Sequence, residues 1–313
     1  MRLTRFAWLV LGWNVAVILW GAFVRATGSG AGCGAHWPLC NGEVVPRAPA
    51  LETMIEFTHR ATSGIALLLV VALCLWVFRD KPRGHPARRA AGASLFFILT
   101  EAAVGAGLVL FRLVGQNDSV ARALFMAGHL ANTFVLLACL TLTVHWCGTD
   151  APLRPEAVSR LAWPFGIGAI ALVGVGKSGA VAALGDTLYP AQSVLGGLAQ
   201  DVSPTAHFLV QLRVAHPIVA LAGALLVALA ASRVLQSTDD GGARRAAWAV
   251  SSLALVQLGA GLLNVALLAP VWMQIVHLLL ADLLWIAFVL LAVRALSLPL
   301  AGPAKEGALA RAA

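Results

Sequence analysis

The chain has 313 residues, of which 60% are apolar and 12% charged, and its mean hydropathy is +0.85. An ordinary soluble domain carries about 25% charged residues, so this composition excludes a soluble enzyme, a disordered chain and a disulfide-rich secreted domain. The formal net charge of +8 is therefore interpreted as a signal of membrane orientation and not of nucleic-acid binding.

Eight apolar runs are long enough to cross a bilayer, for which a helix needs about 20 apolar residues. In chain order they are 6–24, 55–78, 91–111, 120–144, 161–176, 206–231, 246–268 and 271–293. The runs are continuous rather than alternating, which excludes a β-barrel, and no signal peptide or mitochondrial presequence is evident. The sequence predicts an all-α integral membrane protein with eight transmembrane helices in a bacterial inner membrane.

The basic residues are distributed unevenly between the two sides of the predicted membrane. With eight spans both termini share one side, and that side holds 15 of the 22 Lys and Arg residues. The positive-inside rule then places both termini in the cytoplasm. The loops 25–54, 112–119 and 177–205 are expected to face outward.

The layout of the spans indicates an internal repeat, and we predict two tandem four-helix bundles. In each half a long outer loop joins the first two helices and a basic cytoplasmic loop joins the second and third. We expect an N-terminal half at 1–147, a cytoplasmic linker at 148–160, a C-terminal half at 161–295 and a disordered cytoplasmic tail at 296–313.

Five of the eight histidines lie toward the outer ends of predicted spans, and the four spans concerned are all even-numbered. They are His59, His129, His207, His216 and His277. A lone histidine in a membrane helix ordinarily hydrogen-bonds to a neighbouring helix, although intramembrane ionisable residues are functional candidates. One histidine on each even-numbered helix gives each half a facing pair, which is what six-coordinate haem iron requires. Zinc fits less well, because no further Cys or His accompanies each pair.

The sixth span offers two histidines, and only one of them can face a common haem. His207 and His216 are nine residues apart, so they point to opposite faces of the helix. The residue offset between the halves favours His207, because His207 follows His59 by the same number of residues as His277 follows His129. Depth in the membrane favours His216, because Gln211 and Arg213 separate His207 from the apolar run. We choose His216. The predicted ligands of the iron are His59, His129, His216 and His277.

Glu56 precedes His59 by three residues, so the two side chains share one helix face. A buried carboxylate there can serve as a general base. The alternative is an acid that complements the helix dipole or pairs with Arg60. The matching place before His216 carries Arg213, so the two halves are not expected to share the same chemistry. Glu56 is the candidate catalytic residue.

Two of the five cysteines lie in the first outer loop, at Cys33 and Cys40. In an oxidising compartment they can close a small disulfide ring, or they can take part in thiol chemistry during a reaction. The remaining cysteines, Cys74, Cys139 and Cys147, are interpreted as packing residues.

Three motifs of the first half together resemble the signature of the haem A synthase family. They are the run from Arg25 to Gly30, the loop from Cys33 through Trp37, Pro38 and Leu39 to Cys40, Asn41 and Gly42, and the run Glu56-Phe57-Thr58-His59-Arg60. His129, His216-Pro217 and His277 fall where the other haem ligands of that family lie. The resemblance covers about residues 5–295.

The resemblance implies an oxidoreductase that converts haem O to haem A. A ring methyl group is oxidised to a formyl group through successive hydroxylations, with water as the oxygen source. It implies that His59 and His129 hold the substrate haem beside Glu56 as the essential acid, and that His216 and His277 hold haem b. It also implies a disulfide between the cysteines of the first outer loop.

Partners follow from the same resemblance. A haem O synthase would supply the substrate, and haem A would pass to cytochrome oxidase assembly; a homo-oligomer is also considered. Arg25, Arg60 and Arg213 are candidates, by charge and side only, to bind the haem propionates. The sequence departs from the family in the loop 177–205, which lacks the second cysteine pair of many members.

Two other functions are compatible with parts of the sequence. A bis-histidine dihaem cytochrome that relays electrons to or from quinone would use the four histidines, but it gives Glu56 and the cysteine loop no role. A transporter with inverted repeats fits poorly, because the two predicted halves have the same orientation in the membrane.

Overall fold

The structure, a computed structural model, describes residues 1–299, and this part of the chain contains helices, loops and one isolated β-bridge between Cys40 and Glu43. The α-helices are α1 (Arg2–Ala26), α2 (Leu51–Asp80), α3 (Pro86–Leu110), α4 (Val120–Gly148), α5 (Pro155–Leu188), α6 (Val194–Asp201), α7 (Phe208–Gln211), α8 (Ala215–Ser237), α9 (Gly241–Ala266) and α10 (Val271–Ser297). Two 3-10 turns, η1 (Ser29–Ala31) and η2 (Leu212–Val214), complete the order.

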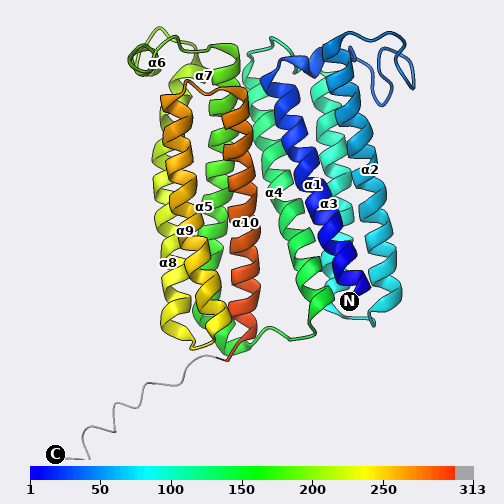
Figure 1. Cartoon of the computed structure of the whole chain (residues 1–313), viewed down its shortest axis with the longest axis vertical. Coiled ribbons are helices and arrows are strands. Elements are labelled where there is room, and N and C mark those ends of the chain that lie inside the picture. Colours follow the sequence, from blue (N-terminus) through cyan, green and yellow to red (C-terminus); the bar gives the residue numbers. More distant parts are fainter. Residues whose placement is uncertain (300–313) are drawn as a thin grey trace, which may run out of the picture.

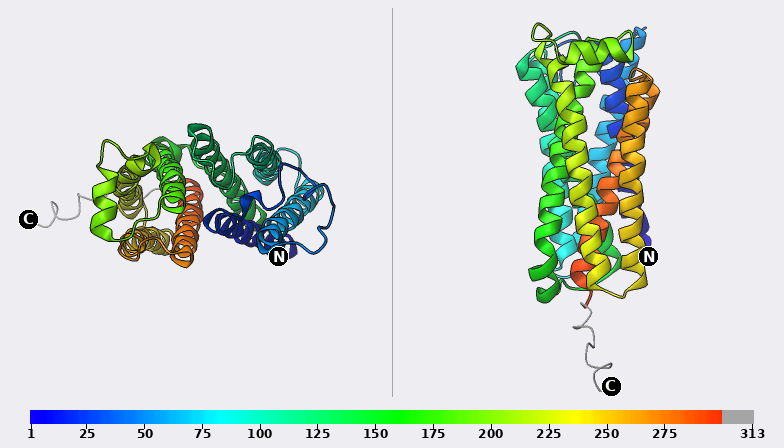
Figure 2. Two further views of the ribbon diagram at one scale, coloured as in Figure 1. Left: turned by 90° about the horizontal axis from the view of Figure 1, so that it is seen from above. Right: turned by 90° about the vertical axis from the view of Figure 1, so that its left-hand side faces the viewer.

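Eight helical stretches within residues 1–299 are long and apolar enough to cross a membrane, which confirms the predicted fold class. One of them, Phe208–Ser237, is assembled from α7, η2 and α8. Figure 1 shows the spanning helices in two groups that stand side by side, α1 to α4 in one and α5 with α8, α9 and α10 in the other. The view from above in Figure 2 shows the same two groups, consistent with tandem bundles.

At the boundary between the two groups α4 packs against α5 and α10, and α1 adds contacts to α10. There the indole Nε1 of Trp285 donates a hydrogen bond of 2.6 Å to the carbonyl oxygen of Phe134, and the two aromatic rings stack at 5.4 Å. Stacked aromatic rings contribute beyond their buried area, so this pair fixes the register of α4 against α10.

Arg25, at the outer end of α1, ties the two groups together. Its Nη1 donates to the carbonyl oxygen of Ala183 at 2.7 Å and to the hydroxyl of Thr187, while its Nη2 donates to Oε1 of Gln274 at 2.7 Å. These partners belong to α5 and α10. The sequence offered Arg25 as a binder of a propionate, whereas in this structure its donors are used between the halves.

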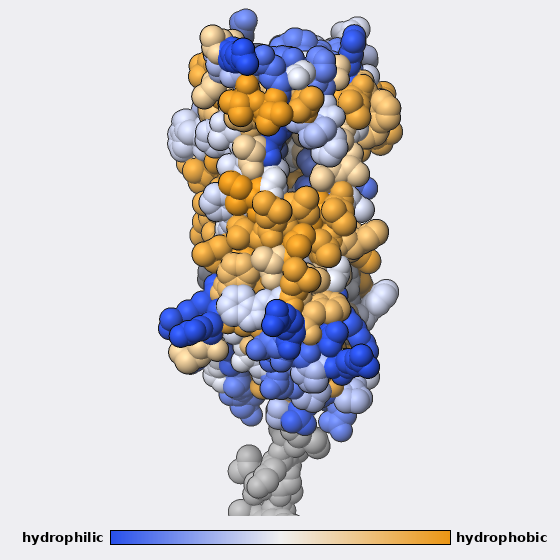
Figure 3. Space-filling view, turned by 90° about the vertical axis from the view of Figure 1, so that its right-hand side faces the viewer, coloured by the Kyte–Doolittle hydropathy of each residue, from blue (hydrophilic) through white to orange (hydrophobic). Residues whose placement is uncertain are grey.

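The outer surface of the helices is apolar, as a bilayer requires. Figure 3, which views the side formed by the first group, shows a broad hydrophobic band between hydrophilic ends. Large apolar side chains such as Leu68 and Phe96 are 68% and 59% exposed. In water such a surface would aggregate, whereas in a membrane it contacts lipid tails.

Two predicted boundaries differ from the structure. Helix α5 covers Pro155–Leu188 rather than 161–176, because Lys177 interrupts the apolar run without interrupting the helix. Part of the predicted linker 148–160 and part of the predicted loop 177–205 are therefore helical. The predicted tail 296–313 begins inside α10, and its residues from 300 onward lie outside the described residues.

Candidate functional site

The four predicted iron ligands lie at similar depths, toward the end of the molecule that carries the long loops. His59 lies eight residues after the start of α2 at Leu51, and His216 lies eight residues after Phe208. His129 and His277 lie nine and six residues after the starts of α4 and α10. Counted from the helix starts, His59 therefore corresponds to His216, and His129 to His277.

The histidines of the second half face each other. The ring centroids of His216 and His277 are 6.4 Å apart, and the rings are almost perpendicular at 85°. A metal–imidazole bond is about 2 Å long, so two rings that hold one iron from opposite sides have centroids roughly 6 Å apart. Nδ1 of His216 lies 3.0 Å from the hydroxyl of Ser178. This spacing fits a bis-histidine haem.

His207 lies outside this pair, at the outer surface. Its Nδ1 caps α7 by accepting from the backbone N–H of Leu209 at 3.4 Å, and its ring stacks on Tyr189 at 4.9 Å. Its Nε2 lies 3.6 Å from Asp118. The hydroxyl of Tyr189 donates to Asp118 at 2.6 Å, and this hydrogen bond holds the pKa of Asp118 below its ordinary value. The geometry thus favours His216 as the partner of His277.

Three of the four rings are packed against glycines of neighbouring helices. A Cβ atom added to each glycine would lie 2.9, 3.0 or 3.2 Å from Cε1 of the facing ring. The pairs are Gly21 with His59, Gly179 with His216, and Gly261 with His277. Glycine lets the helices approach where a side chain would displace the imidazole. These glycines were missed by the sequence reasoning, which considered only the polar residues.

The two histidines of the first half are described here by the surroundings of their ring nitrogens. Nδ1 of His59 is buried without a hydrogen-bond partner, and Nδ1 of His129 lies 3.3 Å from Oε1 of Glu101. One imidazole on each of two facing helices of a four-helix bundle, with no hydrogen bond to Nε2 of either ring among the described residues, suits a haem iron. The residues present therefore fit the group that the sequence predicts.

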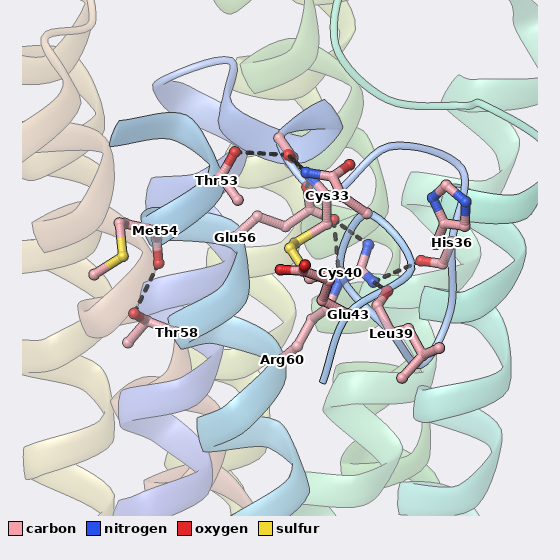
Figure 4. Close-up of a disulfide and its surroundings, with 12 residues drawn as sticks. Cys33, His36, Leu39, Cys40, Glu43, Thr53, Met54, Glu56, Thr58 and Arg60 are labelled. Atoms are coloured by element: carbon pink, nitrogen blue, oxygen red, sulfur yellow. Dashed lines mark hydrogen bonds and ion pairs between the residues drawn. A yellow bond between two sulfur atoms is a disulfide. The ribbon is translucent and has the colours of Figure 1, made fainter. Parts of the chain in front are cut away.

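Glu56 is buried, with 3% of its surface exposed, and both of its carboxylate oxygens are in use. Oε2 accepts a hydrogen bond of 2.8 Å from the backbone N–H of Cys33, and Oε1 accepts from Nε and Nη2 of Arg60. Arg60 then donates from Nη1 to the carbonyl oxygens of His36 and Leu39, at 2.6 and 2.7 Å. Figure 4 shows this chain of contacts from α2 into the first outer loop.

Cys33 and Cys40 form a disulfide, which confirms the pairing that the resemblance implied. Both cysteines are buried, at 0% and 2% exposure. The loop is also held on α2 by the hydroxyl of Thr53, which donates to the carbonyl oxygen of Gly32 at 2.8 Å. A Cβ atom on Gly32 would lie 2.5 Å from the carbonyl carbon of Glu52. Only glycine allows the loop to lie this close to the helix.

Arg213 holds the outer segment of the second half. Its Nε donates to Asp201 at 2.8 Å, and its Nη1 donates to Asp186 at 3.1 Å and to the carbonyl oxygen of Tyr189 at 3.2 Å. Arg213 therefore connects the end of α5 with α6, and only 9% of its surface is exposed. Like Arg60, it was a candidate for a propionate, and its donors contact protein groups in this structure.

A family model described as Cytochrome oxidase assembly protein matches residues 4–289, nearly the whole chain. The chain belongs to this family. A protein named Protoheme IX farnesyltransferase from Thermus thermophilus is 54% identical over 295 residues, which are 94% of this chain and 48% of that protein.

Proteins named Heme A synthase are also similar to this family member. Those from Alkalihalophilus pseudofirmus and Exiguobacterium sibiricum are 37% and 38% identical over 144 residues each. The matches cover 46% and 45% of this chain, and the same shares of those two proteins. The chain spans about half the length of the curated relatives it matches.

A second acid of this family member lies beside a predicted ligand, and the sequence reasoning missed it. Glu101 belongs to α3, inside the predicted span 91–111, and faces α4. The signal that could have found it is an acidic residue in the middle of an apolar run, which is costly in a membrane and is a functional candidate. Glu101 lies on a different helix from His129, so the spacing along one helix that singled out Glu56 does not reveal it.

Proposed function

We propose that this protein is a haem A synthase, an oxidoreductase that oxidises a ring methyl group of haem O to a formyl group via hydroxylated intermediates. The observation that carries the proposal is an asymmetry between the halves. Among the described residues each half has two histidines at similar depth, but only the first has a carboxylate within one turn of one of them, Glu56; the buried Asp282 of the second half lies five residues beyond His277. Family membership and the similarity to proteins named Heme A synthase support the same activity.

In this proposal the first half binds the substrate haem through His59 and His129. The second half binds haem b through His216 and His277, whose rings already have the spacing that one iron requires. Haem b, when bound, supplies one-electron redox chemistry. The glycines packed against three of these rings fix where the imidazoles lie between the helices.

Glu56 is assigned the role of the acid–base residue. Oxidation of a methyl group with oxygen from water releases equal numbers of protons and electrons; the electrons must pass to an external acceptor, and a buried carboxylate is suited to accept a proton. Arg60 and the N–H of Cys33 hold its oxygens in place. The disulfide loop from Cys33 to Cys40 covers this carboxylate from the outer side, as Figure 4 shows.

The Thermus relative supports a partner for this reaction. It is named for the transfer of a farnesyl group to protohaem IX, and the stretch similar to this chain makes up 48% of its length. Farnesylation of protohaem is the kind of reaction that supplies haem O. We therefore propose that a haem O synthase in the same bacterial inner membrane hands its product to this protein, whose termini both lie in the cytoplasm.

The proposal is tested by producing the protein together with a source of haem O and separating the extracted haems by chromatography. Haem A, or its hydroxylated intermediate, is expected to accumulate. Glu56→Gln should keep both haems and lose haem A production. Glu52→Gln, which changes an exposed acid on the same helix, should keep haem A production. Normal bis-histidine spectra with no oxidised haem would exclude the synthase.

One observation favours a second function, a dihaem cytochrome that only relays electrons. Both oxygens of Glu56 are occupied by Arg60 and Cys33, so this acid has a structural role regardless of any catalysis. In a cytochrome, Glu56→Gln would loosen the loop without any effect on haem composition. The same extraction experiment therefore distinguishes the two functions.

A further inference from the structure

The further inference concerns Glu101, an acid of α3 whose side chain is 19% exposed and lies next to the predicted ligand His129. Its Oε1 is 3.3 Å from Nδ1 of His129, the ring nitrogen that would be left over when Nε2 binds an iron. Nδ1 has no hydrogen-bond partner among the described residues, because its N–H does not point at this oxygen. The two atoms are within hydrogen-bond distance, and only the direction of the N–H leaves them unpaired.

The carboxylate of Glu101 is fixed from α4 by two residues that follow His129 by three and four positions. Nδ2 of Asn132 donates to Oε2, and the hydroxyl of Thr133 donates to Oε1. Asn132 also donates to the carbonyl oxygen of Phe97 at 2.9 Å, and its own oxygen accepts from Thr100 at 2.7 Å. The acceptor is therefore held in place by contacts within the protein.

The second half places a different residue at the corresponding position. Glu101 lies four residues before Gly105, which is five residues from the end of α3, and Gln257 lies four residues before Gly261, which is five residues from the end of α9. Nε2 of Gln257 donates to the carbonyl oxygen of His277 at 3.1 Å and lies 3.4 Å from Nε2 of its ring. The same helix position thus faces a predicted ligand in both halves, once with a carboxylate and once with an amide.

We propose that Glu101 is a positioning residue that accepts a hydrogen bond from Nδ1 of His129 and makes this imidazole a stronger electron donor to the iron of the first half. The inference rests on the proposed function only in that His129 is a haem ligand. A carboxylate partner fixes the tautomer and orientation of a ligating histidine and raises its basicity. The haem of the first half should therefore have a lower reduction potential than it would have with a neutral partner.

The test uses full-length protein with the substitution His216→Leu, which leaves only the first half able to hold a bis-histidine haem. Glu101→Gln in this background should raise the reduction potential of the remaining haem and shift its low-spin electron paramagnetic resonance signal. Its haem affinity should fall by about 10- to 100-fold. Glu101→Asp should restore part of the shift in potential.

The matched control is Gln257→Leu in the His59→Leu background, where only the second half holds haem. There a neutral neighbour is lost that contacts Nε2 and the carbonyl oxygen of His277 and not its Nδ1, so the change in potential should be smaller than that of Glu101→Gln. A structural role for Glu101 would lower thermal stability but leave potential and resonance signal unchanged, and that outcome overturns the inference.

Failure of the proposed function gives a different result from failure of this inference. If His129 is not a ligand, the His216→Leu protein shows no bis-histidine signal even with Glu101 intact, which overturns both. If haem is bound but haem A is never made, the potential of the first-half haem still reports on Glu101. The readout uses protohaem and does not depend on turnover.

Discussion

At the end of the molecule that carries the long loops, each half holds its loop segment with a buried charged residue. The charge of this residue is negative in the first half and positive in the second. In the first half an acid, Glu56, holds the outer loop through Arg60 and the backbone of Cys33. In the second half a base, Arg213, holds the segment containing α6 through Asp186 and Asp201. Glu56 and Arg213 each lie three residues before a predicted ligand, so the repeat has kept the position and reversed its charge.

This difference separates the features that both halves share from those that only one half has. Both halves need a polar anchor where a spanning helix meets its outer segment, because buried charges require partners. Only the anchor of the first half can accept a proton. The two halves therefore have the same scaffold and different chemical capacities, and each prediction below would break or sharpen that comparison.

The largest effect is expected at the predicted ligands of the second half. His216→Leu should abolish haem binding in that half, because an aliphatic side chain cannot ligate iron. His207→Leu should leave haem content unchanged, since this ring packs on Tyr189 at the surface. The amount of haem bound per chain, measured by the pyridine haemochrome spectrum, shows which of the two histidines is the ligand. Loss of haem in the His207→Leu variant alone would show that His207, and not His216, corresponds to His59.

A smaller effect is expected at the anchor of the second half. Arg213→Leu leaves Asp186 and Asp201 without their main partner and should cost about 3 kcal/mol of stability. Arg213→Lys should recover only part of this, because one ammonium cannot reproduce the forked contacts of a guanidinium. Thermal unfolding in detergent measures the loss, with Arg160→Leu, an exposed arginine on α5, as the control. Equal melting temperatures for the variants at 213 and 160 would show that the anchor does not matter.

The smallest effect concerns pH at the surface, where Asp118 of the first half meets Tyr189 of the second. The hydrogen bond from Tyr189 keeps the pKa of Asp118 below its ordinary value, so its contribution to stability is present above the unfolded pKa of about 3.9 and is lost as pH falls through the folded pKa. Tyr189→Phe removes this contribution. The melting temperatures of wild type and variant should therefore differ most near pH 6 and converge toward pH 3. A constant difference over this range would remove Asp118 from the explanation.

The sequence was sufficient to predict features that depend on a single continuous stretch of the chain. The eight spans follow from apolar runs, and Cys33 and Cys40 pair as the resemblance implied. The limits of α5 were missed because hydropathy falls at Lys177, although backbone hydrogen bonds inside a helix do not depend on that side chain.

The features that were missed depend on contacts between helices. Glu101 has meaning only because α3 packs on α4 and places its carboxylate beside His129. Likewise Gly179 is an ordinary membrane-helix glycine until α8 places the ring of His216 against it. The sequence paired histidines on different helices through the repeat and the resemblance, but it gave no partners for the arginines, which were assigned to propionates by charge and side alone.

The contacts of Arg25 bear on how the chain is connected. On the outer side the halves are joined through Arg25, which reaches α5 and α10, whereas on the inner side they are joined by the backbone between Gly148 and Pro155. The stacked rings of Phe134 and Trp285 add a contact within the bundle. Because the contacts of Arg25 and of the stacked rings lie away from the connecting segment, we expect covalent continuity there to be dispensable. Two polypeptides divided at this segment should reassemble in one membrane.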